Sequence, residues 1–164
     1  MFLRRSGDAV SVWEVEATST LQTILLVSPQ ERSALVESLA TSSPQKTASA
    51  LLVGVLTRPD QAKLWTEFLI RFSIDDTLKT VLPPLLVQFD NLSDISQIQL
   101  VWLVGEILGR ISSKTLEDFE GIVVGILRHI SGNRNRPGFN ALVVQSMLHW
   151  ISHSSVYSGI EEFL

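Results

Sequence analysis

Residues 94–112 read DISQIQLVWLVGEILGRIS, and the distribution of apolar side chains in this segment is unusual. At about 100° per residue, apolar or small side chains surround nearly the whole helical cylinder. The polar side chains gather into one narrow strip, formed by Ser96, Gln99, Glu106 and Arg110. A helix that is apolar on almost every side packs against several neighbours. We therefore expect residues 94–112 to form a central helix of an all-α protein.

Helix starts occur along the whole chain. Ser28-Pro29-Gln30-Glu31 offers an N-cap serine, a proline at the first helical position and a glutamate at the third. Ser43-Pro44 repeats this arrangement, and no alternating strand pattern competes with the helices. The start signals and the apolar periodicity predict helices over residues 9–27, 29–41, 44–57, 59–72, 74–90, 94–112, 115–131 and 138–153.

The spacing of these helices predicts a repeat architecture. Helices starting near 74 and 115 have one helix between them, which matches the period of about 40–47 residues in HEAT and armadillo repeats. The expected fold is all-α, a HEAT/armadillo-like helical-repeat stack of about eight helices, and an irregular helical bundle is the alternative. Residues 1–164 would form a single domain, the N-terminal part of a longer scaffold, with residues 1–8 disordered.

Composition excludes several classes of function. The chain has 164 residues, a net charge of −4 and no cysteine, which excludes a disulfide framework, a cysteine-based zinc site and a cysteine nucleophile. The excess of acidic residues argues against direct binding of nucleic acid, and no segment is apolar enough to predict a membrane span. His149 and His153 have the i,i+4 spacing of zinc ligands but lack a third ligand. We expect no metal, no cofactor and no enzymatic activity.

The basic residues concentrate at one place, which is the candidate partner-binding site. Arg128 and His129 lie at the end of the helix predicted over 115–131, and Arg134 and Arg136 lie in the loop that follows. Cations at a helix C-terminus complement the negative end of its dipole, which is one interpretation of this cluster. The other interpretation is a contact loop for an anionic group or a protein partner, because loops on rigid scaffolds often carry recognition.

Three segments resemble one known family. Residues 99–107 (QLVWLVGEI), 55–62 (VLTRPDQA) and 128–132 (RHISG) are similar to the N-terminal region of the third subunit of the Integrator complex. Members of this family also belong to the sensor of single-stranded DNA complex, abbreviated SOSS. The similar segments occur in the family's order, and together the resemblance covers residues of about 50–155. Gly105 departs from the family pattern, which tends to have a basic residue there.

The resemblance implies a non-catalytic helical-repeat scaffold in the nucleus, with the cytoplasm as a further location. Such a scaffold would take part in small nuclear RNA 3′-end processing, transcription termination and the DNA damage response. Its implied partners are other Integrator subunits and an OB-fold protein that binds single-stranded DNA.

Two further expectations concern alternatives to this interpretation. A free-standing eight-helix superhelical module of the membrane-trafficking type, which binds lipid headgroups or peptides, is the alternative function; it would need a basic patch for anionic lipids. The helix over residues 138–153 has an apolar arc too wide for one neighbour. We therefore expect the chain to self-associate through this exposed C-terminal face or to need a C-terminal continuation that covers it.

The basic loop generates the first testable prediction. Changing Arg134 and Arg136 to Glu should leave the circular dichroism spectrum unchanged, because exposed loop charges contribute little to stability. If these arginines contact a partner, recovery of that partner in a pull-down should fall by at least ~10-fold, the scale of a lost charge contact. Unchanged recovery would assign both arginines to compensation of the helix dipole.

Overall fold

The computed structural model describes Leu3, residues 12–88 and residues 91–110. Within these ranges the chain is helical and no residue belongs to a strand, which confirms the all-α class. The chain divides into two compact units, Met1–Gln99 and Leu100–Leu164. The helices predicted over 115–131 and 138–153 lie outside the described residues. The single domain over 1–164 stays a prediction.

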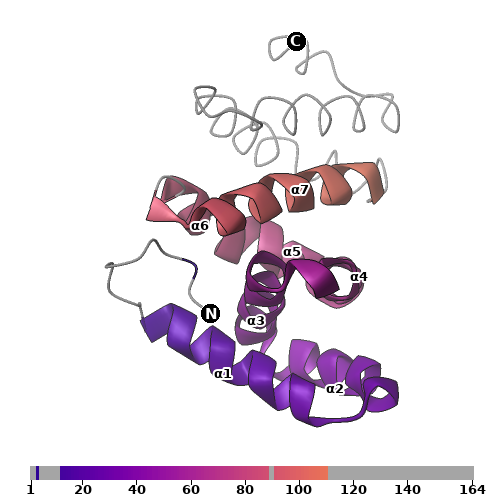
Figure 1. The fold of residues 1–164 in the computed structure, drawn as a ribbon. Coiled ribbons are helices and arrows are strands. Elements are labelled where there is room, and N and C mark those ends of the chain that lie inside the picture. The colour runs from indigo at the N-terminus through magenta and orange to yellow at the C-terminus, as the bar shows by residue number, and fades with distance from the viewer. Residues whose placement is uncertain (1–2, 4–11, 89–90, 111–164) are drawn as a thin grey trace. The chain divides into compact units, whose positions relative to one another are not determined.

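The first unit begins with helices close to the predicted ranges. They are α1 (Val12–Leu26), α2 (Pro29–Ser42), α3 (Pro44–Thr57) and α4 (Ala62–Phe72), with a short 3-10 turn η1 (Pro59–Gln61) before α4. Figure 1 shows α3 in the middle of these helices. It packs against α1, α2 and α4.

Helix α3 is enclosed on all sides. Every residue from Thr47 to Leu56 is buried, so no face of this part of the helix meets solvent. By contrast, α2 has a single fully buried residue, Val36, and α1 has one buried stripe. The sequence pattern predicts the helix over 94–112 as the central one; among the described residues, α3 has the longest continuous buried run.

A glycine lets α3 and α4 approach closely. A Cβ added to Gly54 would lie 2.9 Å from Cγ of Trp65, at the root of the indole ring. Trp65 is fully buried, and its Nε1 donates a hydrogen bond of 3.3 Å to Oε1 of Gln61, one turn earlier. Its ring also meets the edge of Phe68, with 6.0 Å between the ring centroids. Because this tryptophan is fixed from several directions, it has little room to move away from α3.

The segment predicted as one helix over 74–90 is interrupted. It consists of α5 (Ile74–Asp76), a π-helical turn η2 (Thr77–Val81) and α6 (Leu82–Val87). Pro83 and Pro84 have no N–H, so two carbonyl groups of the preceding turn lose their α-helical donors. The backbone widens there, and the N–H of Leu82 bonds to the carbonyl of Thr77, five residues earlier.

Helix α7 (Asp94–Arg110) begins with a capped turn. The hydroxyl of Ser93 accepts a hydrogen bond of 3.2 Å from the N–H of Ser96, and the two hydroxyl oxygens lie 3.0 Å apart. Ser96 is only 1% exposed, and these hydrogen bonds satisfy its polar groups in the buried position. By contrast, Ile95 and Ile98 are 58% and 47% exposed. Ser96, although it belongs to the polar strip of this helix, is therefore buried.

Leu3, near the N-terminus, is buried and hydrogen-bonded. Its side chain is 1% exposed, and its carbonyl accepts a hydrogen bond of 2.6 Å from the N–H of Ser93. The disorder expected for residues 1–8 stays a prediction. The other residues of 1–8 lie outside the described part of the chain.

The close approach of α3 and α4 generates a prediction for Gly54→Ala. Helix propensity alone would stabilise the variant by about 1 kcal/mol. The clash with Trp65 should outweigh this gain and lower the free energy of unfolding by about 1 kcal/mol net, because overpacking a fixed ring costs roughly 1–3 kcal/mol. Thermal unfolding measures the effect. In a double-mutant cycle, Trp65→Phe should reduce the penalty, whereas a melting temperature raised by Gly54→Ala would contradict the packing.

A matched pair of substitutions tests the buried and exposed faces of α7. Val104 is 3% exposed, so Val104→Asp should bury an unpaired charge and remove several kcal/mol of stability, roughly the whole margin of a typical domain. Ile98→Asp makes a comparable change at a position that is 47% exposed, and its melting temperature should stay within a few degrees of wild type. Equal losses in the two variants would contradict the described faces of this helix.

Candidate functional site

The first unit has a mostly apolar cavity of about 310 Å³. Its lining comes from Leu3, the start of α1, the start of α3, the π-helical turn η2, α6 and Leu92. The apolar side chains of the lining are Leu3, Trp13, Val81, Pro84, Leu85 and Leu92. A cavity of this size with mostly apolar walls has the dimensions of a small ligand site or a pocket for a partner's side chain.

The cavity has a buried floor and an exposed rim. Its floor includes Leu3, Val81, Leu85 and Leu92, which are all at most 6% exposed. Its rim consists of more exposed residues from three elements, Gln45, Thr80, Pro84 and Gln88. The space is therefore open to solvent on one side and closed by apolar side chains on the other. The π-helical turn supplies residues to both, since Thr80 and Val81 are adjacent but differ in exposure.

One carboxylate lies in this apolar setting. Glu14 lines the cavity and is 1% exposed, and it belongs to the first turn of α1. The carbonyl of Glu14 accepts a hydrogen bond of 2.8 Å from the hydroxyl of Thr18. A carboxylate near a helix N-terminus is favoured by the helix dipole. Such a group adds preference for a cation or a hydrogen-bond donor to a site that is otherwise apolar.

A second hollow of about 240 Å³ adjoins the same helix ends. It shares Trp13 and Gln45 with the first cavity and adds residues from α1 and α3, namely Glu16, Ala17, Lys46 and Ser49. The half-buried side chain of Trp13 therefore has hollowed surface on two sides. Aromatic side chains in this position are common anchors at protein interfaces.

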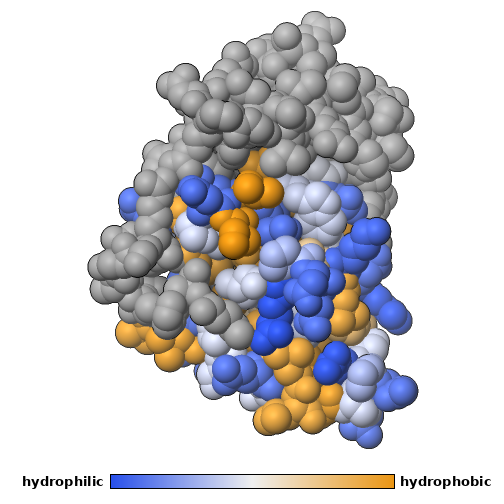
Figure 2. Space-filling view, in the orientation of Figure 1, coloured by the Kyte–Doolittle hydropathy of each residue, from blue (hydrophilic) through white to orange (hydrophobic). Residues whose placement is uncertain are grey.

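Exposed apolar side chains also occur on α1. Val12, Val15 and Leu26 are 75%, 56% and 86% exposed. Figure 2 shows hydrophobic groups at the surface over α1, at the lower edge of the face that it draws. They are interrupted by hydrophilic residues, so they form small groups instead of one continuous apolar patch.

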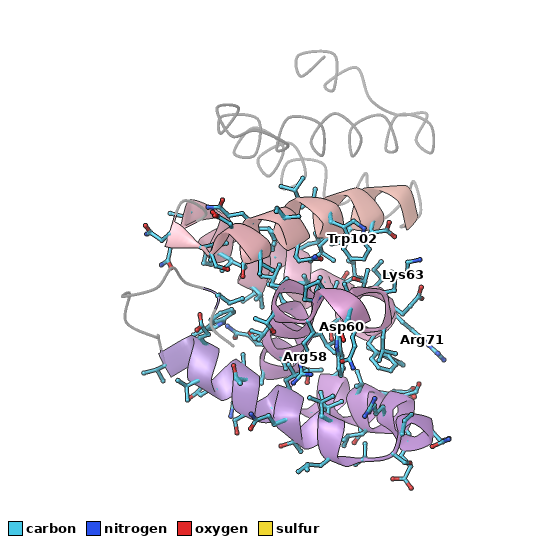
Figure 3. The ribbon with its side chains drawn as sticks, in the orientation of Figure 1. Arg58, Asp60, Lys63, Arg71 and Trp102 are labelled. Carbon is cyan, nitrogen blue, oxygen red and sulfur yellow. The ribbon has the colours of Figure 1, made fainter. Side chains whose placement is uncertain are left out.

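Charged side chains on α4 form a different kind of surface. Figure 3 shows Lys63 and Arg71 projecting outward from this helix, with Arg58 and Asp60 at the junction of α3 and α4. The guanidinium of Arg71 lies 4.9 Å from the centroid of the Phe72 ring. The positive and negative charges are mixed, as on an ordinary solvated helix, so this surface has no single sign of charge to attract a ligand.

The sequence did not predict the cavity. No motif in it singles out Trp13 or Glu14. A signal was present, because Glu14, Ala17, Leu21 and Ile24 follow the helical period of one buried stripe. A carboxylate at the first position of an otherwise apolar stripe is unusual. The apolar residues of η2 and α6 gave no such signal, since their contribution depends on the fold.

The site predicted from sequence, Arg128, His129, Arg134 and Arg136, lies outside the described residues. It stays a prediction. Within the described residues, no group of three His, Cys, Asp or Glu side chains is placed to hold a metal ion. In the same part of the chain, no helix is both long enough and apolar enough to cross a bilayer.

The fold and the cavity together define an all-α protein with an apolar hollow at the ends of three helical segments. No protein-family model and no curated protein sequence matches this chain.

Proposed function

We propose that this protein is a non-catalytic helical scaffold that binds protein partners. The observation that carries the proposal is the apolar cavity beside Trp13, with its exposed rim and its buried carboxylate Glu14. Apolar walls with few polar groups suit the burial of a partner's side chain.

The proposed architecture is a HEAT/armadillo-like stack of helix pairs. Its support is the length of the connections in the first unit, because one or two residues join α1 to α2, α2 to α3 and α4 to α5. Short connections favour antiparallel neighbours, as in stacked helical repeats. In such a stack each helix pair contacts its neighbours and leaves its surface loops and helix ends free for partners.

The resemblance to the N-terminal region of the third Integrator subunit gives the proposal its partners. Two of its three segments lie among the described residues. Residues 55–62 include the end of α3, η1 with its proline and the first residue of α4, and residues 99–107 lie within α7. We propose nuclear partners, namely other Integrator subunits and an OB-fold protein that binds single-stranded DNA.

The test is an affinity pull-down from nuclear extract with quantitative mass spectrometry, using the full 164-residue chain. Integrator subunits or the OB-fold protein should be recovered with the wild-type chain. Thr80→Arg places a long side chain at the rim of the cavity, and Thr80 is exposed, so the fold should be retained. We expect recovery of the partner to fall by at least ~10-fold if its side chain enters the cavity.

Thr41→Arg is the matched control. Thr41 is an exposed threonine on α2 that does not line the cavity, so the same chemical change should leave recovery unchanged. Equal recovery with both variants would exclude the cavity as the contact. Recovery of none of the named partners would argue against the Integrator proposal.

A further inference from the structure

Two Ser-Pro dipeptides occur at helix starts, but the structure treats them differently. Ser28-Pro29 precedes α2 and Ser43-Pro44 precedes α3. Ser28 is exposed and has an extended backbone, with φ −62° and ψ 151°. Ser43 is half-buried, with φ −140° and ψ 69°. The two serines share a sequence motif, and their geometry separates them.

The backbone and surroundings of Ser43 hold it in place. Its N–H donates a hydrogen bond of 2.7 Å to the carbonyl of Leu39, and its carbonyl accepts bonds of 3.0 Å and 2.8 Å from the N–H and hydroxyl of Thr47. The helix that follows is α3, the enclosed helix of the first unit. An extended backbone at Ser43 would break these hydrogen bonds and displace the start of the buried helix α3.

Ser28 is held less firmly than Ser43. Its carbonyl accepts a hydrogen bond of 2.9 Å from the N–H of Glu31, and its hydroxyl makes no capping hydrogen bond. Leu26, two residues earlier, is 86% exposed. Val36 is the only fully buried residue of α2, so the first turn of this helix can open at small cost.

We propose that Ser28 is a phosphorylation site for a proline-directed serine kinase. Such kinases bind the acceptor serine in an extended segment followed by a trans proline, and the extended backbone of Ser28 before Pro29 suits this requirement. In the reaction, the Oγ of Ser28 forms a bond to the γ-phosphorus of ATP. The bond from that phosphorus to the β,γ-bridging oxygen breaks, ADP leaves, and the hydroxyl proton passes to the kinase's catalytic base.

The residue that would hold the phosphate is Arg32, one helical turn after Ser28. Its Nη2 donates a long hydrogen bond of 3.4 Å to the carbonyl of Leu25, which places the guanidinium at the junction of α1 and α2. Its Nε is buried and makes no hydrogen bond. A phosphate on Ser28 would offer three acceptor oxygens to this guanidinium. Glu31 would oppose it, but arginine binds phosphate with paired hydrogen bonds.

The test treats the native 164-residue chain with a mitogen-activated protein kinase and MgATP, and maps the phosphate by mass spectrometry. Peptides spanning residues 22–36 and 37–51 are controls in which neither serine is held by the fold, so both should be modified. In the native chain, Ser28 should react at least ~20-fold faster than Ser43, in keeping with the lower cost of local opening at α2.

Lys46 lies three residues after Ser43, where many proline-directed kinases prefer a basic residue, so sequence preference alone predicts the opposite order. Equal or faster modification of Ser43, or an unmodified Ser28, would overturn the proposal.

A second measurement tests the role of Arg32. Phosphorylation of Ser28 should raise the melting temperature by about 2–4 °C, because the phosphate joins the helix N-terminus and the guanidinium. In Arg32→Gln the increase should be lost, whereas the rate of phosphorylation should be unchanged. The same increase in both proteins would show that Arg32 does not hold the phosphate.

Discussion

The first unit depends on the close contact of α3 with α4, where the absence of a side chain at Gly54 admits the indole of Trp65. This contact buries a large aromatic ring, and the missing side chain lets the two helices approach closely. Helix α3 is buried from Thr47 to Leu56, so it is the helix against which the neighbouring helices of this unit pack. Helix α1 covers one side, the π-helical turn η2 reaches another, and α2 lies at the edge with little of its own surface buried.

The cavity is a consequence of two local constraints that this arrangement brings together. Pro83 and Pro84 remove hydrogen-bond donors and widen the backbone over Thr77–Val81, so successive residues of η2 supply both a floor and a rim. The first turn of α1 supplies the second wall, with Trp13 at its side and Glu14 in its depth. A regular helix over the whole of 74–90 would present another set of side chains to α1. The irregular turn therefore gives this surface its shape, as is common for π-helical turns near functional sites.

Most helix boundaries of the described region could be read from the sequence, because their causes are local. Pro29, Pro44 and Pro59 each begin a helical segment, since a proline needs no intrahelical donor in a first turn and disfavours helix in the residue before it. The chemistry of the caps was less predictable. Ser93 uses its hydroxyl to cap α7, whereas Ser28 and Ser43 do not, although all three occupy the same kind of position. A hydroxyl has alternative rotamers, and the chain around it decides which one it adopts.

The sequence by itself determined the all-α class and the order of the main helical segments before residue 110. These follow from the period of apolar side chains and from the geometry of proline, which act within a few residues. Only the tertiary structure decided that α3 is the enclosed helix, that Ile95 and Ile98 face solvent while Ser96 is buried, and that Trp13 and Glu14 line a cavity with η2. The physical reason is that a pattern of apolar residues shows how much of a helix can be buried. Which neighbour buries it is set by contacts between residues far apart in the chain, such as Gly54 with Trp65 and Leu3 with Ser93.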